Sequence, residues 1–431
     1  MVIVPSVLLD QLASGRLSAV ESVDRALARI EANDLGAWLA LDADGARRHA
    51  QAADMLRAGG ERGALLGAPV AVKDVIDAAG WPTTAGSDGW ARVPETDATV
   101  VARVRAAGGI VLGKTATNEF AFGIDGTNPH HPPCRHPRDP DRLPGGSSAG
   151  STVAVAAGHA AVAIGTDTSG SLRVPAALCG VLALRPTPGR VPRDGVVPLA
   201  PTYDVVGPIA ATAADLALTF ATLAGEPPVA PPPHPPARGA TVEALLGPDM
   251  CHPDVAEVLR AAIARLGLDV EPVELDIADA ATVHHDIQVP EGDRSLDDLG
   301  VDRSRLSDVV RQRAASARQI TQAARDRAAA RRGEIAGDLA FAIAQHDVLL
   351  APAAPIVAPL RDRDTVDLGG GRTKAVREAL LSCAVPFAQG PFPAISVPAG
   401  EVDGLPVGLQ IVGAPGSDEM LIALAGRLLE A

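Results

Sequence analysis

The chain has 431 residues, of which 47% are hydrophobic and 2% aromatic, and its formal net charge at pH 7 is −14. This length and apolar content support a large buried core and exclude a disordered chain. The negative charge would repel phosphate backbones, and so few aromatic side chains leave little material for base stacking. We therefore expect no nucleic-acid partner.

The cysteines and the N-terminus indicate the compartment. Cys134, Cys179, Cys251 and Cys383 lie far apart and form no CxxC pair, which argues against a disulfide scaffold and favours a reducing compartment. The first residues lack a basic region, and Asp10 comes too early for a signal peptide. Since no run of 18 apolar residues occurs, we expect no membrane span and a cytoplasmic protein.

The first half of the chain alternates between helical and strand-like segments. Helix is predicted over the first 35 residues, where Ser18 and Glu21 can form a capping box. The segments that follow are a strand over 68–73, a helix over 98–107, a strand over 110–112, a helix over 151–157 and a strand over 160–164. This alternation predicts an α/β fold whose sheet is covered by helices on both faces.

The second half begins with a proline-rich connector at residues 226–238, which we expect to be extended and exposed. Residues 295–340 predict one or two long solvated helices, and acids interspersed among their arginines disfavour an RNA contact. Further elements are predicted as strands over 347–350, 394–397 and 407–412 and a final helix from about Ser417.

Two loops of glycine and serine are the most unusual feature of the sequence. Residues 145–150 read GGSSAG and residues 165–171 read GTDTSGS. Small residues let the backbone turn tightly and let its amides approach a ligand. Taken singly, each loop is also compatible with an ordinary tight turn in a buried sheet.

Taken together, GGSSAGS and then GTDTSGSLRVPAALCG resemble the signature of the amidase signature family. The resemblance extends over nearly the whole chain and is loose only at about residues 225–340. Its further segments are GAPVAVKDVID (67–77), 98–123, RPTPGRVP (185–192), DVLLAPAAP (347–355) and 391–413. It implies the amidase signature fold, a large mixed β-sheet covered by helices on both faces. It also implies a single domain over 1–431, in which 1–225 carry the catalytic residues and 239–431 add a variable helical region and complete the sheet.

The resemblance also implies a catalytic set. Ser171 aligns with the family's nucleophile, Ser147 with the serine beside a non-proline cis peptide bond, and Lys73 with the catalytic lysine. The implied activity is that of an amidase, which hydrolyses a small carboxamide or another amide through an acyl-enzyme on Ser171. The resemblance implies no cofactor or metal. The expected partner is a small amide substrate. Because dimers are common in this family, a homodimer is also an expectation.

The binding residues implied by the same motifs surround the nucleophile. The backbone amides of Thr168, Ser169 and Gly170, with that of Ser171, align with the family's oxyanion hole. The backbone of Ala121 is expected nearest the substrate. Ser169 departs from the commonest family form, which has glycine there, so this position must avoid a strongly positive φ.

Elementary chemistry gives these residue types a reason. A serine hydroxyl is a poor nucleophile until a base removes its proton. A lysine can be that base only when it is neutral, which requires burial or nearby cations to lower its pKa. The apolar run APVAVK places Lys73 in the interior, where such a shift is expected, and Ser147 would relay the proton.

Other chemistries fit the sequence less well. Residues 146–150 match the G-x-S-x-G elbow of α/β-hydrolases, but the proline-containing residues 137–144 before them cannot form the strand that this elbow needs. A triad through His159 lacks a nearby partner. A structural role in orienting the loop is favoured for Asp167 and Arg173.

A group of potential ligands suggests a metal site as a minor alternative. His130, His131, Cys134 and His136 lie close together in sequence, but prolines intervene and no second ligand cluster follows. We expect them in a loop over the active site.

Two alternative functions are also considered for a chain with these motifs. The chain could be the glutaminase (A) subunit of a tRNA-dependent amidotransferase, which delivers ammonia inside a complex. A non-catalytic docking homologue is disfavoured, because such proteins typically lose catalytic residues that this chain retains.

Overall fold

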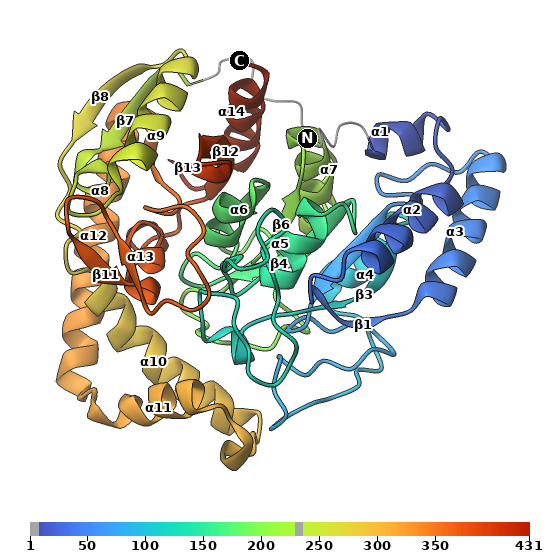
Figure 1. Cartoon of the computed structure of the whole chain (residues 1–431), viewed down its shortest axis with the longest axis horizontal. Helices are drawn as coiled ribbons and strands as arrows, with labels where there is room; N and C mark the ends of the chain where they lie inside the picture. Colours follow the sequence, from blue (N-terminus) through green and yellow to red (C-terminus); the bar gives the residue numbers. More distant parts are fainter. Residues whose placement is uncertain (1–7, 229–235) are drawn as a thin grey trace.

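The computed structural model describes residues 8–228 and 236–431, and one large mixed β-sheet runs through them (Figure 1). Within this part of the chain the sheet has eleven strands in the spatial order β1 (Trp38–Leu41), β3 (Ile110–Thr115), β2 (Pro69–Lys73), β4 (Val162–Asp167), β6 (Val205–Ala210), β5 (Leu182–Arg185), β12 (Ala394–Val402), β13 (Leu405–Gly413), β9 (Val348–Pro352), β7 (Arg238–Val242) and β8 (Asp269–Val273). Strand β2 is parallel to β3 and β4, β7 is parallel to β8 and β9, and antiparallel pairs join these groups. The predicted fold class is confirmed.

Helices cover both faces of the sheet because successive strand residues point to opposite sides. Val70 and Val72 of β2 join a core that includes the buried residues of α4 (Thr99–Ala106), α7 (Ala213–Ala224), α9 (Pro253–Arg265) and α14 (Asp418–Glu430). Ala71, between the two valines, joins a different core with α5 (Ala149–Ala156) and α6 (Arg173–Cys179). The small side chains on this second face, including Ala163 and Ala183, let the short helices α5 and α6 lie close to the strands.

Local capping explains the N-terminal helices. Helix α1 spans Leu8–Ala13, and α2 (Ala19–Ala32) begins after Ser18, whose side chain accepts from the Glu21 N–H while Glu21 accepts from the Ser18 N–H. The predicted capping box is confirmed. Helices α2 and α3 (Ala43–Ala58) then pack on Ile110 and Leu112 of β3.

Most predicted elements exist, with shifted ends. The predicted strands at 68–73, 110–112, 160–164, 347–350, 394–397 and 407–412 correspond to β2, β3, β4, β9, β12 and β13, and the predicted helices to α4, α5 and α14. Strands β12 and β13 are nine residues each, longer than predicted, because they form a hairpin that lies within the sheet. The chain also has β10 (Thr365–Asp367) and β11 (Thr373–Ala375), which form a separate two-stranded sheet.

The region predicted as one or two long solvated helices is partly different. It holds the end of α10 (Ala280–Asp298) and then α11 (Asp308–Ser316) and most of α12 (Gln322–His346). Each of these helices buries part of its surface, for example Leu296, Val310 and Ile335, so they are packed rather than fully solvated. They reach out from the sheet at the lower left of Figure 1. The remaining short elements are α8 (Glu243–Leu246), α13 (Val376–Ser382) and the 3₁₀ turns Glu119–Ala121, Arg303–Arg305, Ala317–Gln319 and Pro386–Ala388.

The proline-rich connector predicted at 226–238 falls largely outside the described residues, because 229–235 are not among them. Within residues 8–228 and 236–431, no helix combines the length and the apolar character that crossing a bilayer would require.

A glycine at the sheet edge allows the first strand to pair. A Cβ at Gly113 of β3 would lie 1.9 Å from the Ala40 carbonyl oxygen of β1, which leaves no room for any other residue. We expect Gly113→Ala to lower the free energy of unfolding by about 1–3 kcal/mol or more, because the strands must shift. The exposed Gly333 of α12 has no heavy atom within 4 Å of such a Cβ. Gly333→Ala should therefore raise the free energy of unfolding by about 0.5–1 kcal/mol, since alanine favours helix. Urea unfolding followed by circular dichroism measures both, and equal effects of the two substitutions would contradict this account.

Candidate active site

The predicted catalytic residues meet at one edge of the sheet. Strands β2 and β4 are parallel neighbours, so their carboxyl ends lie at the same edge. Lys73 is the last residue of β2, and the loop with Ser171 follows β4. Ser147 lies just before α5, which packs against both strands.

The ε-amine of Lys73 contacts two hydroxyls. Its Nζ lies 2.7 Å from Ser147 Oγ and 2.7 Å from Thr166 Oγ1, and its side chain is fully buried. No carboxylate pairs with it among the described residues. Desolvation lowers the pKa of Lys73 to about 7, although Asp167 and Asp204 act in the opposite direction. A neutral amine has one lone pair and two hydrogens, so it can accept from Ser147 and donate to Thr166.

The two serine loops lie against each other. The Gly146–Ser147 peptide bond is cis, and the Ser148 N–H donates to the Ser171 carbonyl oxygen at 3.2 Å. In the described parts of the chain no hydrogen bond joins the hydroxyls of Ser147 and Ser171. The structure thus brings Lys73 and Ser147 into direct contact and places the Ser171 backbone beside them.

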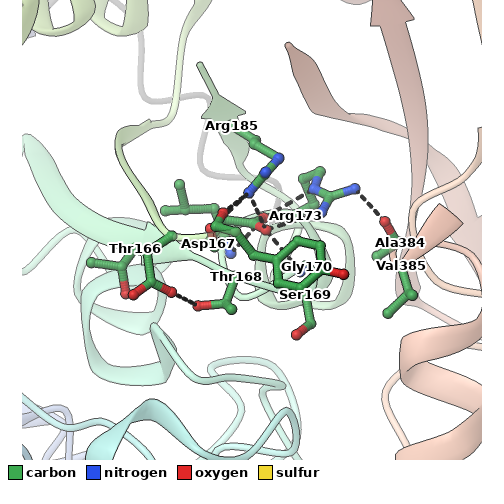
Figure 2. A network of polar contacts seen from close by, with 12 residues as sticks. Thr166, Asp167, Thr168, Ser169, Gly170, Arg173, Arg185, Ala384 and Val385 are labelled. Carbon is green, nitrogen blue, oxygen red and sulfur yellow. Dashed lines mark hydrogen bonds and ion pairs between the residues drawn. The ribbon is translucent and has the colours of Figure 1, made fainter. Parts of the chain in front are cut away.

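A buried carboxylate holds the loop before Ser171 (Figure 2). Asp167 accepts from the Gly170 N–H at 2.8 Å and from Arg173 through Nε and Nη2, both at 2.9 Å. Arg185 donates to the Asp167 carbonyl oxygen at 2.7 Å. Burial alone would raise the pKa of Asp167, but Arg173 and Arg185 outweigh it and hold the pKa below its usual range. The expected structural role of Asp167 and Arg173 is confirmed.

The amides of the same loop differ in their partners. The Gly170 N–H is engaged by Asp167, whereas the N–H groups of Thr168, Ser169 and Ser171 have no acceptor among the described residues. Gly170 has a φ of 121°, and a Cβ there would lie 2.5 Å from that of Ala384. Ser169 has no positive φ, as its departure from glycine requires. Three of the four amides aligned with an oxyanion hole are therefore available to a ligand.

Ala121 lies in a loop that packs against the first serine loop. Phe120 and Ala121 have φ values of 48° and 56°, a conformation that few residues other than glycine adopt. The nearby Gly146 N–H donates to the Ile124 carbonyl oxygen at 2.7 Å, and Asn118 accepts from the Gly126 N–H at 3.1 Å. This loop is thereby fixed beside Ser147.

Sequence reasoning missed several residues of the site. Asp204 accepts from Thr168 Oγ1 at 2.5 Å, and burial raises the pKa of Asp204 to about 6. His284 and Gln288 of α10 contact the Ser169 side chain. Thr166 could have been found from its place at the end of a strand in GTDT. His284 and Gln288 could not, because their stretch matches the family pattern only loosely.

The alternative sites are accounted for by other contacts. His130 lies between Asp88 and Glu119, and His136 Nε2 donates to the Leu178 carbonyl oxygen at 2.8 Å. No group of three metal-ligating side chains is placed to hold an ion in residues 8–228 and 236–431. His159 is buried, and desolvation lowers its pKa to about 4. Residues 137–144 form no strand, so the α/β-hydrolase elbow is excluded.

The lysine–serine contact and the loop with free amides lie together at the carboxyl ends of β2 and β4. The Amidase family model matches residues 21–422, so the chain belongs to the amidase signature family. It is 36% identical to the A subunit of the glutamyl-tRNA(Gln) amidotransferase of Roseiflexus castenholzii, over 96% of this chain and 92% of that protein. It is 34% identical to AtzE, a subunit of the 1-carboxybiuret hydrolase of Pseudomonas sp., over 98% and 97%. A crystal structure of an amidase superimposes with a TM-score of 0.91 at 34% identity, covering 98% of each chain. The protein is an amidase, an enzyme that hydrolyses carbon–nitrogen bonds of amides.

The carboxylate of Asp167 should dominate the stability of the site. Asp167→Asn leaves the buried guanidinium groups of Arg173 and Arg185 without a counter-ion, so we expect the free energy of unfolding at pH 7 to fall by about 3–5 kcal/mol. Because the folded pKa of Asp167 is lowered, its contribution is present above the unfolded pKa and is lost as the pH falls toward the folded one. Denaturant titration at several pH values measures the free energy of unfolding of the wild-type and Asp167→Asn proteins. Asp10→Asn, in an exposed pair with Arg16, is the control and should change stability little. Equal effects of the two substitutions would contradict the role given to Asp167.

Proposed function

We propose that this amidase converts a small carboxamide or another amide into a carboxylate and ammonia or an amine through an acyl-enzyme on Ser171. The observation that carries the proposal is the buried Lys73 amine, which lies 2.7 Å from Ser147 Oγ and has no carboxylate partner among the described residues. An amine held in this way is a base at neutral pH.

Each residue has a step in the proposed reaction. Neutral Lys73 takes the proton of Ser147, which takes the proton of Ser171 as its oxygen attacks the amide carbon. The protonated lysine returns a proton through Ser147 to the leaving nitrogen, and the carbon–nitrogen bond breaks. Water then attacks the acyl-enzyme by the same proton route and releases the carboxylate.

The free backbone amides would stabilise the negative charge of the tetrahedral intermediate by hydrogen bonding. The N–H groups of Thr168, Ser169 and Ser171 would donate to the tetrahedral oxyanion, and each such donor contributes roughly 3–4 kcal/mol to lowering the barrier. The Gly170 amide, engaged by Asp167, would shape the loop. We place the substrate along the backbone of Ala121.

The 36% sequence identity to the A subunit of a glutamyl-tRNA(Gln) amidotransferase supports a second candidate function. In that role the chain would release ammonia from glutamine for a partner enzyme. The discriminating experiment measures ammonia from glutamine with the chain alone and with the other components of an amidotransferase. Release that depends on those components favours the second candidate, and release from simple carboxamides by the chain alone favours the first.

We also propose where and in what form the enzyme works. A cytoplasmic location is supported by four cysteines that are all buried and unpaired. We propose a homodimer and a single domain over 1–431, with the catalytic residues in 1–225 and the sheet completed by 239–431.

Ser171→Ala should abolish amide hydrolysis, by a factor on the order of 10⁴ or more, because no other hydroxyl can form the acyl-enzyme. A fluorophosphonate should label the wild-type protein at Ser171, as peptide mass spectrometry would show. Ser148→Ala is the control and should still be labelled, since Ser148 Oγ donates to the Thr166 carbonyl oxygen and only supports the loop. Labelling of a different residue would displace Ser171 from its role.

The rate should depend on the protonation of Lys73. Because the pKa of this amine is lowered to about 7 and its neutral form is the base, kcat/KM should fall about tenfold per pH unit below 7 and level off above it. Lys73→Met should remove this dependence together with roughly 10²–10⁴-fold of the activity. A profile that is flat between pH 5 and 8 for the wild-type enzyme speaks against a neutral lysine base.

A further inference from the structure

The turn before β6 lies beside the loop that carries the free amides. Strands β4 and β6 are antiparallel, and Asp167, the last residue of β4, pairs with Val205, the first residue of β6. Just beyond this pair, Thr168 follows β4 and Asp204 precedes β6. Thr168 Oγ1 donates to Asp204 Oδ1 at 2.5 Å. This contact joins a residue whose backbone N–H is free to a carboxylate that the proposed reaction does not yet use.

A second contact joins the same two segments. Nη1 of Arg185 donates to the Asp167 carbonyl oxygen at 2.7 Å and to the Tyr203 carbonyl oxygen at 3.1 Å. The peptide bond between Asp167 and Thr168 is trans, so its N–H points away from the carbonyl oxygen that Arg185 holds (Figure 2). Arg185 therefore sets the side of the loop on which the Thr168 N–H lies, and the contact with Asp204 holds the Thr168 side chain.

The Asp204 carboxylate is a fixed acceptor. Its Oδ2 accepts from the N–H groups of Leu199 and Ala200, both at 2.9 Å. Burial raises the pKa of Asp204 to about 6, although Thr168 and these amides act in the opposite direction, so the group is ionised at pH 8. An ionised carboxylate has no hydrogen to donate, so the single hydrogen of the Thr168 hydroxyl points at Oδ1. The two backbone amides thus hold the carboxylate in place for one hydroxyl.

We propose that Asp204 is a positioning residue of the amidase reaction: its carboxylate holds the Thr168 hydroxyl and thereby aims the free Thr168 N–H at the oxyanion. Asp204 acts through Thr168 rather than on the substrate. The inference rests on the proposed function, in which this N–H is one of the oxyanion donors. The oxyanion forms during the chemical step and is not present in the bound amide, so the aim of this donor should affect kcat rather than KM.

The first test is Thr168→Val, which keeps a branched side chain and removes the hydroxyl. With propanamide at pH 8, kcat should fall on the order of tenfold or more, and KM should change less than about twofold. Thr168→Ser, which keeps the hydroxyl, should lose much less. The matched control is Thr202→Val, because the Thr202 hydroxyl also donates to a carboxylate, that of Glu291 on α10, but lies outside the amide loop. Its kcat should equal that of the wild type.

The second test replaces the carboxylate by Asp204→Asn. The two backbone amides require the oxygen of the asparagine side chain, so its NH₂ group faces the Thr168 hydroxyl and the acceptor is lost. We expect kcat to fall as in Thr168→Val, and the double variant to lose no more than Thr168→Val alone, because Asp204 acts through that hydroxyl. A double variant in which the two separate losses multiply would contradict this route.

The rate of labelling by a fluorophosphonate separates this inference from the proposed function. As Ser171 displaces fluoride, the phosphoryl oxygen gains negative charge and uses the same donors. Slower labelling of Ser171 in Thr168→Val and Asp204→Asn, with wild-type labelling in Thr202→Val, supports the inference without any amide substrate. Wild-type labelling and wild-type kcat in both variants, or a rise in KM alone, overturn the inference and leave the proposed function standing. A wild-type protein that is not labelled at Ser171 overturns both.

Discussion

The ε-amine of Lys73 is buried against two hydroxyls, and its desolvation is the constraint on which the proposed chemistry depends. Burial also lowers the pKa of the second buried lysine, Lys114, but this lysine has a carboxylate partner: its Nζ lies 3.0 Å from Asp74 Oδ1 and 2.8 Å from Thr83 Oγ1. Lowering the pKa of Lys73 from 10.5 to about 7 corresponds to roughly 5 kcal/mol against the charged form. This destabilisation of the charged amine arises because the apolar strand β2 ends on Lys73 and places its side chain in the interior.

The neighbouring carboxylates would restore the charge of Lys73 if they were free. Asp167 would be the strongest of them, but it is shared between Arg173 and Arg185, which offset its charge. Asp204 raises the pKa of Lys73 less than Asp167 does, and burial raises the pKa of Asp204 itself to about 6, although Thr168 and two backbone amides favour its ionised form. The cluster that shapes the loop before Ser171 therefore also keeps negative charge away from the base.

The central sheet and the position of the site could be predicted from sequence because local signals agree there. APVAVK has the length and composition of a buried strand, and the glycine–serine loops follow elements with clear boundaries. The ends of β12 and β13 were not predictable, since their pairing in a hairpin extends them beyond their apolar centres. The start of α10 was missed because its sequence, with Pro290 inside the helix, contradicts helix propensity and is stabilised by packing. The contacts of His284 with the Ser169 loop join residues 115 positions apart, a distance at which no local pattern operates.

The most direct test of this account is the titration of Lys73 itself. The chain has three lysines, Lys73, Lys114 and Lys374, so lysine labelled with ¹³C at Cε gives few NMR signals, and Lys→Arg variants assign them. The account predicts that the Lys73 signal titrates with a pKa of about 7. A Lys73 pKa near 10.5 would contradict the claim that this lysine is a neutral base.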